Sequence, residues 1–271
     1  LFQELQDEGY TDYLAFPIAF HTGVDAIRDR DGMLMSWVCD QPGGFMPEDL
    51  HNIQRLSQRL AVVIKLWARE QVAHNVARAY LGARVGDHVL SGHIRRGDAQ
   101  QINAIIWYAD LRGSTDMADT LPLETVTAAL NDYFDCVAGA VLDHQGDVLR
   151  FIGDAVLAIF PFEDSDMSAV EAHRRAYAAA VEAFDSMKQV NARRAAEGAL
   201  QLSFGLALHP GRILYGNIGI PERVEFSVIG GAVNETARIE ALTKDLDEPL
   251  LVSEAFVERL QGEWREIGLF E

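Results

Sequence analysis

The order of strand-like and helix-like patterns from residue 104 onward constrains the fold of this chain more than any other feature. A β-prone run at 104–110 precedes a helical pattern at 122–144, a hairpin pattern at 147–160 and a second helical pattern at 166–197. The remaining predicted elements are strands 201–208, 212–217 and 224–229, helix 232–244, strand 249–252, helix 254–261 and a last strand at the end of the sequence. This order predicts an α+β fold with a ferredoxin-like βαββαβ core, in which the first strand lies beside the hairpin.

Residues 1–68 follow a different pattern and predict a separate module. Two apolar runs, "YLAFPIAF" and "GMLMSWVC", are typical of short strands joined by a charged turn. From Glu48 onward, apolar residues recur at spacings of three and four and predict a long helix with a heptad-like stripe: Ile53, Leu56, Leu60, Val63 and Trp67. A coiled coil and a helix packed on its own domain both agree with this stripe. We assign residues 69–103 to a helical linker and residues 104–271 to a second domain.

The formal charge of -18, from 41 acidic against 23 basic residues, limits the partners of this chain. Such a surface repels nucleic acids and anionic membranes, and the two basic clusters, "HIRRGD" and "NARRAAEG", are typical of solvated linker or helix faces. No segment approaches the roughly 20 apolar residues that cross a bilayer. We therefore expect a cytoplasmic protein with no nucleic-acid partner and no membrane contact from this segment. Cys39 and Cys136 lack metal-ligand spacing and are expected to be small core residues.

Two acidic residues follow strand patterns at positions that the fold would bring together. Asp110 closes the run "AIIWYAD" before the polar turn "LRGST", and Asp154 lies in the turn of the hairpin "DVLRFIGDAVLAIF". Each residue alone is an ordinary cap or turn residue. In a βαββ arrangement both carboxylates converge and would repel each other without a cation, and oxygen ligands on turns suit Mg²⁺ carrying a phosphate substrate. Backbone N–H groups after Asp110 would face an anion.

A second candidate cluster lies in the predicted helix 232–244. Asn234 and Arg238 are four residues apart and share one helix face. One interpretation is a surface arginine paired with Glu235 or Glu240, which is a frequent and energetically minor arrangement. Beside a metal-bound triphosphate, the same face would offer a hydrogen-bond partner and a fixed positive charge to a transition state.

Three motifs in this order resemble those of the class III nucleotidyl cyclases: "WYADLRGST", "RFIGDAVLAIF" and "FSVIGGAVNETARIE". The resemblance covers residues 104–271 and implies a ferredoxin-like catalytic domain that acts as a homodimer, with active sites shared between the subunits. It implies that Asp110, Asp154 and the backbone carbonyl of Leu111 hold two Mg²⁺ ions, for which Mn²⁺ can substitute. The implied reaction converts ATP to 3′,5′-cyclic AMP and pyrophosphate. In that reaction, Asn234 orients the ribose and Arg238 stabilises charge on the transferring phosphoryl group.

The resemblance also assigns residues to the base and the phosphates of the substrate. Arg150 and Ser227 occupy the two base-reading positions, where adenylyl cyclases usually carry Lys with Asp or Thr and guanylyl cyclases carry Glu and Cys. Because Arg donates to adenine N1 as Lys does and Ser can replace Thr, we expect ATP as the substrate. The phosphate-facing turn comprises Gly113, Ser114 and Thr115. The alternatives are a guanylate cyclase and a non-catalytic nucleotide-binding or regulatory module on the same fold.

Residues 1–68 loosely resemble the C-terminal part of a GAF-type sensor domain, through the two strands, the stretch "PGGFMPEDL" and the helix. The match covers half of such a domain, so we assign it no ligand. The heptad-like helix and the linker 69–103 would then set the relative placement of two catalytic domains and thereby switch activity. This hypothesis would be wrong if a chain starting near residue 100 were as dimeric and as active as the whole chain.

Overall fold

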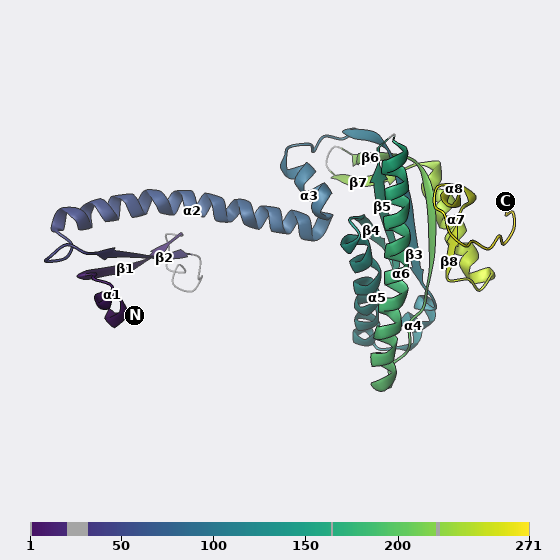
Figure 1. Cartoon of the computed structure of the whole chain (residues 1–271), viewed down its shortest axis with the longest axis horizontal. Coiled ribbons are helices and arrows are strands. Elements are labelled where there is room, and N and C mark those ends of the chain that lie inside the picture. Colours follow the sequence, from purple (N-terminus) through teal and green to yellow (C-terminus); the bar gives the residue numbers. More distant parts are fainter. Residues whose placement is uncertain (1, 21–31, 164, 221–222, 271) are drawn as a thin grey trace. The chain divides into compact units, whose positions relative to one another are not determined.

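The computed structural model describes residues 2–20, 32–163, 165–220 and 223–270. The chain divides into two compact units, Leu1–Val76 and Ala77–Glu271. Figure 1 shows a long helix with a small sheet in the first unit and a layered α/β arrangement in the second. None of the helices among the described residues is both long enough and apolar enough to span a membrane.

The N-terminal unit contains the two predicted strands. They are β1 (Asp12–Ala19) and β2 (Gly32–Cys39), which pair antiparallel along their whole length. The charged turn that we predicted between them lies outside the described residues. A short helix that the sequence did not suggest, α1 (Phe2–Asp7), precedes the strands.

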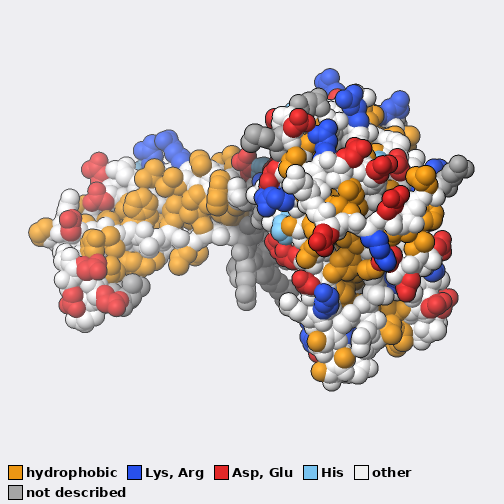
Figure 2. Space-filling model, turned by 45° about the vertical axis from the view of Figure 1, so that its right-hand side comes forward, with side chains coloured by type: hydrophobic (Ala, Val, Ile, Leu, Met, Phe, Trp, Pro, Cys, Tyr) orange, Lys and Arg blue, Asp and Glu red, His pale blue; other side chains and the backbone are white. Residues whose placement is uncertain are grey.

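The long helix of this unit is α2 (Pro47–Leu81), which begins beside two acidic residues, Glu48 and Asp49, that favour a helix N-terminus. Its buried residues are Ser57 and Ala61, whereas the predicted stripe is largely exposed: Leu56 47%, Leu60 37%, Val63 62% and Trp67 61%. Figure 2 shows apolar side chains gathered on the exposed surface of this unit. Packing of the helix on its own domain therefore accounts for the burial of Ser57 and Ala61. The exposed heptad-like stripe remains available to another partner.

The second unit is built on one mixed sheet with the strand order β4-β5-β3-β6-β7, in which β8 pairs with β6. The strands are β3 (Ala99–Leu111), β4 (Asp147–Ile152), β5 (Ala155–Phe162), β6 (Phe204–Ile220), β7 (Arg223–Ile229) and β8 (Leu250–Val252). All pairs are antiparallel except β6 with β8. The first strand of the unit thus lies between the β4–β5 hairpin and β6, as the predicted βαββαβ order requires.

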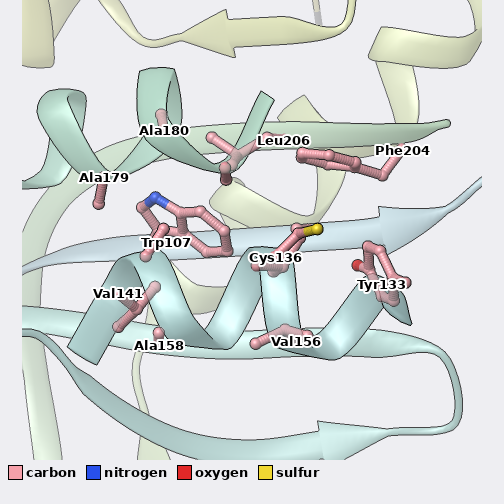
Figure 3. Packing of buried hydrophobic residues seen from close by; sticks show 14 of the residues in the cluster. Trp107, Tyr133, Cys136, Val141, Val156, Ala158, Ala179, Ala180, Phe204 and Leu206 are labelled. Atoms are coloured by element: carbon pink, nitrogen blue, oxygen red, sulfur yellow. The ribbon is translucent and has the colours of Figure 1, made fainter. Parts of the chain in front are cut away.

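Two long helices, α5 (Leu123–Asp143) and α6 (Asp166–Ala196), pack side by side on one face of this sheet (Figure 1). Figure 3 shows Trp107 of β3 between Val141 of α5 and Ala179 of α6, and all three side chains are fully buried. Cys136 lies in the same core, as predicted, whereas Cys39 is only half-buried. The opposite face carries a smaller apolar cluster, to which the linker helix α3 (Ala83–Leu90) contributes Val85.

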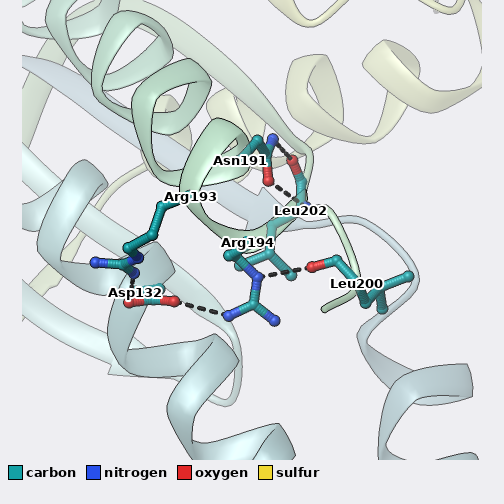
Figure 4. A network of polar contacts seen from close by, with 6 residues as sticks. All are labelled: Asp132, Asn191, Arg193, Arg194, Leu200 and Leu202. Carbon is teal, nitrogen blue, oxygen red and sulfur yellow. Dashed lines mark hydrogen bonds and ion pairs between the residues drawn. The ribbon is translucent and has the colours of Figure 1, made fainter. Parts of the chain in front are cut away.

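A polar network holds the end of α6 to α5 and to the segment before β6 (Figure 4). The buried Arg194 donates to Asp132 of α5 at 2.7 Å and to the Leu200 carbonyl at 2.6 Å. Asn191 donates to the Leu202 carbonyl at 2.7 Å and accepts from its N–H at 2.8 Å. Burial acts to raise the pKa of Asp132, but its two arginine partners outweigh burial and lower that pKa. The network fixes where the chain enters β6, and therefore the register of the central strands.

Several predicted elements differ from the observed ones. The strands predicted at 201–208 and 212–217 form the single strand β6, because β3 pairs with it continuously from Leu111↔Phe204 to Ala99↔Gly216 and carries it past Pro210. For the same reason β3 begins at Ala99, inside the predicted linker. The predicted last strand is wrong: the described residues after α8 (Glu254–Val257) form neither helix nor strand up to residue 270.

Two further helices complete the second unit. The polar segment after Asp110, predicted as a turn, forms a short helix, α4 (Ser114–Thr120). The helix that carries Asn234 and Arg238 is α7 (Gly231–Asp245), one residue longer at each end than predicted. It packs mainly against β6 and also contacts β3.

Candidate active site

The structure brings Asp110 and Asp154 together at one end of the sheet. Antiparallel pairing of β3 with β5 ends at Ala109↔Val156, so Asp110 continues toward the β4–β5 turn. Asp154 lies in that turn, after Gly153, whose φ of 63° is in the left-handed region that glycine tolerates best. The two carboxyl groups are close enough to share a hydrogen bond when one carries a proton.

The two carboxyl groups are poorly compensated within the chain. Burial, followed by the charge of Asp154, raises the pKa of Asp110 to about 6. Oδ2 of Asp154 is buried and has no hydrogen-bond partner among the residues that the structure describes. Two adjacent half-buried carboxylates with one buried, unsatisfied oxygen are unfavourable unless a cation compensates them.

A third carboxylate, Glu240, lies next to this pair, although the sequence analysis considered it only as a possible partner of Arg238. Gly205 of β6 pairs with Asp110, and a Cβ at Gly205 would lie 2.2 Å from Oγ1 of Thr243 and 2.5 Å from Oε1 of Glu240. Because Gly205 has no side chain, α7 can pack close to β6 at this point, and this brings Glu240 to the acidic site. Burial, followed by the charge of Asp110, raises the pKa of Glu240 to about 7. A glycine inside a predicted strand was the available sequence signal, because it often marks a close approach.

The acidic site fits a hard divalent cation on the chemistry of its donors. No cluster of three or more His, Cys, Asp or Glu side chains within the described part of the chain could hold a metal ion. Asp110 and Asp154 offer carboxylate oxygens of the kind that Mg²⁺ prefers, and a cation between them would compensate the unsatisfied Asp154 oxygen and the raised pKa of Asp110. Leu111 is the next residue after Asp110. Glu240 adds negative charge near these donors.

The predicted phosphate-facing residues form the start of α4. Gly113 is the N-cap with a φ of 71°, and its carbonyl accepts the Met117 N–H at 3.0 Å. Gly113 and Thr115 are exposed and Ser114 is half-buried. These residues follow Asp110 directly, so their backbone lies at the same end of the sheet as the acidic pair.

Asn234 and Arg238 lie on an exposed face of α7. Neither side chain has a hydrogen bond or an ion pair to any residue that the structure describes, so Arg238 is not held by Glu235 or Glu240. At about 100° per residue, Glu240 lies about 200° around the helix from Arg238. The face with Asn234 and Arg238 therefore points away from the acidic site of its own chain.

The predicted base-reading residues lie on the two edge strands. Arg150 of β4, next to a register shift in its pairing with β5, forms an ion pair through Nη2 with Oε1 of Glu225 on β7. Side chains alternate along a strand, so Glu225 and Ser227 share one face of β7. The guanidinium of Arg150 thus reaches the face of Ser227 but contacts Glu225, which the sequence analysis missed. The available sequence signal for Glu225 was its position two residues before Ser227, because residues two apart on a strand share one face.

Comparison with known proteins identifies relatives of the second unit. The family model described as "Adenylate and Guanylate cyclase catalytic domain" matches residues 98–267. An adenylate cyclase of Anabaena cylindrica is 30% identical over 172 residues, which cover 62% of this chain and 33% of the relative. Adenylate cyclase 1 of Rhizobium meliloti (strain 1021) is 29% identical over 167 residues, which cover 62% of this chain and 25% of the relative. The chain thus spans a third or less of the length of these two relatives.

Solved structures share the fold. A bacterial light-regulated adenylyl cyclase aligns with a TM-score of 0.63 at 24% identity, over 78% of this chain and 61% of that one. The guanylyl cyclase Cya2 aligns with a TM-score of 0.52 at 29% identity, over 64% of this chain and 85% of that one. The proteins similar to this chain therefore include cyclases of both base specificities.

Proposed function

Because the chain belongs to the adenylate and guanylate cyclase catalytic domain family, we propose that it is an adenylate cyclase regulated by its N-terminal region. It converts ATP to 3′,5′-cyclic AMP and pyrophosphate at active sites shared between two copies of the chain. The observation that carries this proposal is the half-buried pair Asp110 and Asp154, in which a buried Asp154 oxygen has no partner among the described residues and the pKa of Asp110 is raised, so a cation would stabilise the pair. A catalytically dead module would have no need to retain such an unfavourable pair.

Asp110, Asp154 and the Leu111 carbonyl hold two Mg²⁺ ions, or Mn²⁺ in their place. When bound, these ions lower the pKa of the ribose 3′-hydroxyl and neutralise the triphosphate. Backbone N–H groups of residues 113–115 bind the phosphates at the exposed start of α4. Since phosphoryl transfer depends mainly on positioning and charge stabilisation, the chain contributes chiefly by fixing these groups around the triphosphate.

A second copy of the chain completes each site. Asn234 orients the ribose and Arg238 stabilises the developing charge at the α-phosphorus, but both side chains point away from the acidic pair of their own chain. Within one chain the two halves of the machinery lie on different surfaces. A homodimer unites them, and the exposed stripe of α2 provides an apolar surface along which the two copies pair.

The base is read by Arg150 together with β7. Arg150 donates to adenine N1, and the face shared by Ser227 and Glu225 supplies the acceptor for the exocyclic amine. GTP is a second candidate, because the Glu225 carboxylate can also accept two hydrogen bonds from the edge of guanine. The similarity to adenylate cyclases supports ATP as the preferred substrate.

The proposal is tested by mixing two inactive variants, Asp154→Ala and Arg238→Ala. Each variant alone should form no cyclic AMP from ATP with Mg²⁺ or Mn²⁺. In a statistical mixture, half of the dimers combine one copy of each and carry one complete site of two, so activity should return to about one quarter of wild type.

The same assay with GTP measures the base preference of the wild-type chain. A mixture that stays inactive while both variants remain dimeric would contradict the shared site. A wild-type chain that is dimeric and forms no cyclic product from either nucleotide would favour the non-catalytic module.

A further inference from the structure

His209 of β6 connects three elements of the second unit. It is 8% exposed and lies in the centre of the sheet, opposite Ile106 of β3. Its Nδ1 lies 2.8 Å from Oγ of Ser253, the N-cap of α8, and its Nε2 lies 3.3 Å from Oε2 of Glu235 on α7. The ring therefore links the sheet both to the start of α8 and to the helix that carries Asn234 and Arg238.

The hydrogen bonds around His209 have a defined direction. Oγ of Ser253 accepts from the Phe256 N–H at 3.3 Å, and its own hydroxyl proton is free to be donated to Nδ1 of His209. A neutral imidazole that accepts at Nδ1 carries its proton on Nε2, which faces the Glu235 carboxylate at 3.3 Å. Burial favours this neutral form, because it lowers the pKa of His209 more than Glu235 raises it. One line of polar contacts thus runs from α8 through the sheet to α7.

The first turn of α7 has few other polar attachments. Its N-cap is Gly230, which offers no side-chain hydrogen bond. Thr236 is satisfied within the helix, through the Ala232 carbonyl at 2.7 Å. The turn lies so close to the sheet that a Cβ at Gly211 would meet Cβ of Ala232 at 2.2 Å. Apolar contact therefore sets the distance of α7 from the sheet, while His209 and Glu235 supply a polar contact that opposes rotation and sliding of the helix.

We propose that His209 is a positioning residue for the transition-state pair of this site, acting through its electrostatic contact with Glu235. Glu235 is adjacent to Asn234 and one turn from Arg238, so this contact restrains the helix at the residues that need the most accurate placement. A displacement of about 1 Å at such groups lowers turnover by up to about a hundredfold. The inference rests on the proposed function, because it assumes that Asn234 and Arg238 act on the transition state.

Two substitutions separate the hydrogen bond of the ring to Ser253 from its contact with Glu235. The amide of His209→Gln reaches the position of Nε2 and retains a donor for Glu235, whereas the shorter amide of His209→Asn reaches the position of Nδ1 and retains only the bond to Ser253. We expect the Gln variant to keep kcat within about threefold of wild type. The Asn variant should lower kcat by between about tenfold and a hundredfold, with KM for the nucleotide changed by less than about threefold.

A second variant avoids the buried position. Glu235 is 57% exposed at its side chain, so Glu235→Ala leaves the core intact. It should lower kcat as His209→Asn does, and the double variant should be no less active than either single one. His144→Asn is the matched control, because His144 also contacts a glutamate, Glu182 at 2.7 Å, but between α5 and α6. Its kcat should equal that of wild type.

Equal losses of kcat in the Gln and Asn variants of His209, or a full-rate Glu235→Ala, would overturn the positioning role. A loss confined to KM would overturn it as well, because a placement error acts on turnover. A wild-type chain that forms no cyclic nucleotide would instead contradict the proposed function. Melting temperatures of all variants separate a loss of folding from a loss of placement.

Discussion

The two halves of the candidate site are built in opposite ways. Asp110 and Asp154 are brought together by strand pairing, half-buried, and left with an unsatisfied oxygen. Asn234 and Arg238 stand exposed on one face of α7, and their side chains make no hydrogen bond or ion pair with the described part of the chain. The first half concentrates charge at a cost in stability, whereas the second half costs nothing until a partner surface meets it. In the proposed function, each chain would supply one unfavourable acidic pair and one exposed pair that another copy completes.

The largest expected effects come from removing one group of each half. Asp154→Asn and Arg238→Ala should each lower kcat by about a thousandfold or more. Their effects on stability should differ. Asp154→Asn removes the repulsion with Asp110 and should raise the free energy of unfolding of the metal-free protein by on the order of 1 kcal/mol, allowing for solvent screening. Arg238→Ala should change it by less than about 0.5 kcal/mol. Product assays and thermal melts check both, and equal melting temperatures for the two variants would contradict the contrast.

The acidic half depends on the missing side chain at Gly205. Gly205→Ala places a Cβ against Thr243 and Glu240 and must displace α7, so it should destabilise the fold by about 1–3 kcal/mol. Gly139 is the matched control, because a Cβ there would meet nothing within 4 Å. Gly139→Ala in α5 should instead stabilise by about 0.5–1 kcal/mol. Chemical denaturation measures both, and equal values would show that α7 does not pack closely against β6 at Gly205.

A third prediction concerns base reading, which can be tested through the ion pair of Arg150 with Glu225. Glu225→Ala removes the acceptor and frees the guanidinium of Arg150, so the ratio of kcat/KM for ATP to that for GTP should change by about tenfold. Ser227→Ala should change this ratio less if Glu225 is the main acceptor. The measurement is cyclic product formation with each nucleotide at several concentrations. A larger change in the Ser227 variant would assign base reading to Ser227 instead.

The smallest expected effect is a pH dependence confined to the acidic half. Folding raises the pKa of Asp110 from 3.8 to about 6 and that of Glu240 from 4.5 to about 7. The folded state therefore binds protons more tightly, and this contribution to stability is complete below about pH 4 and lost as the pH rises through 6 and 7. Without metal, the melting temperature should fall over that interval by a few degrees, and Mg²⁺ should remove most of the fall. If the melting temperature of the Asp110→Asn variant fell by the same amount over this pH interval, Asp110 would not be the source of the pH dependence.

Much of the fold followed from local patterns in the sequence. Apolar periodicity over 122–144 and 166–197 matches α5 and α6 within one or two residues at each end. The strand order follows from the βαββαβ sequence of elements, so the approach of Asp110 to Asp154 was predictable from one strand and one hairpin turn. The motif resemblance identified the family that the comparisons confirm. The roles of the individual site residues and the GAF-like assignment of residues 1–68 stay predictions.

Tertiary structure decided what depended on contacts between distant segments. Because β3 pairs with β6 without interruption, the two strands predicted on either side of Pro210 form one strand. The predicted last strand does not form, and the described residues after α8 pair with no strand. The contacts of Glu240, Glu225 and His209 join residues that no periodicity relates, because each depends on how α7 or β7 packs against the sheet. The sequence by itself determined the order of the main helices and strands of the second unit and the approach of Asp110 to Asp154, since these follow from local propensity and chain connectivity. Tertiary packing determined the surroundings of these residues, since their burial and their pKa values depend on neighbours from distant parts of the chain.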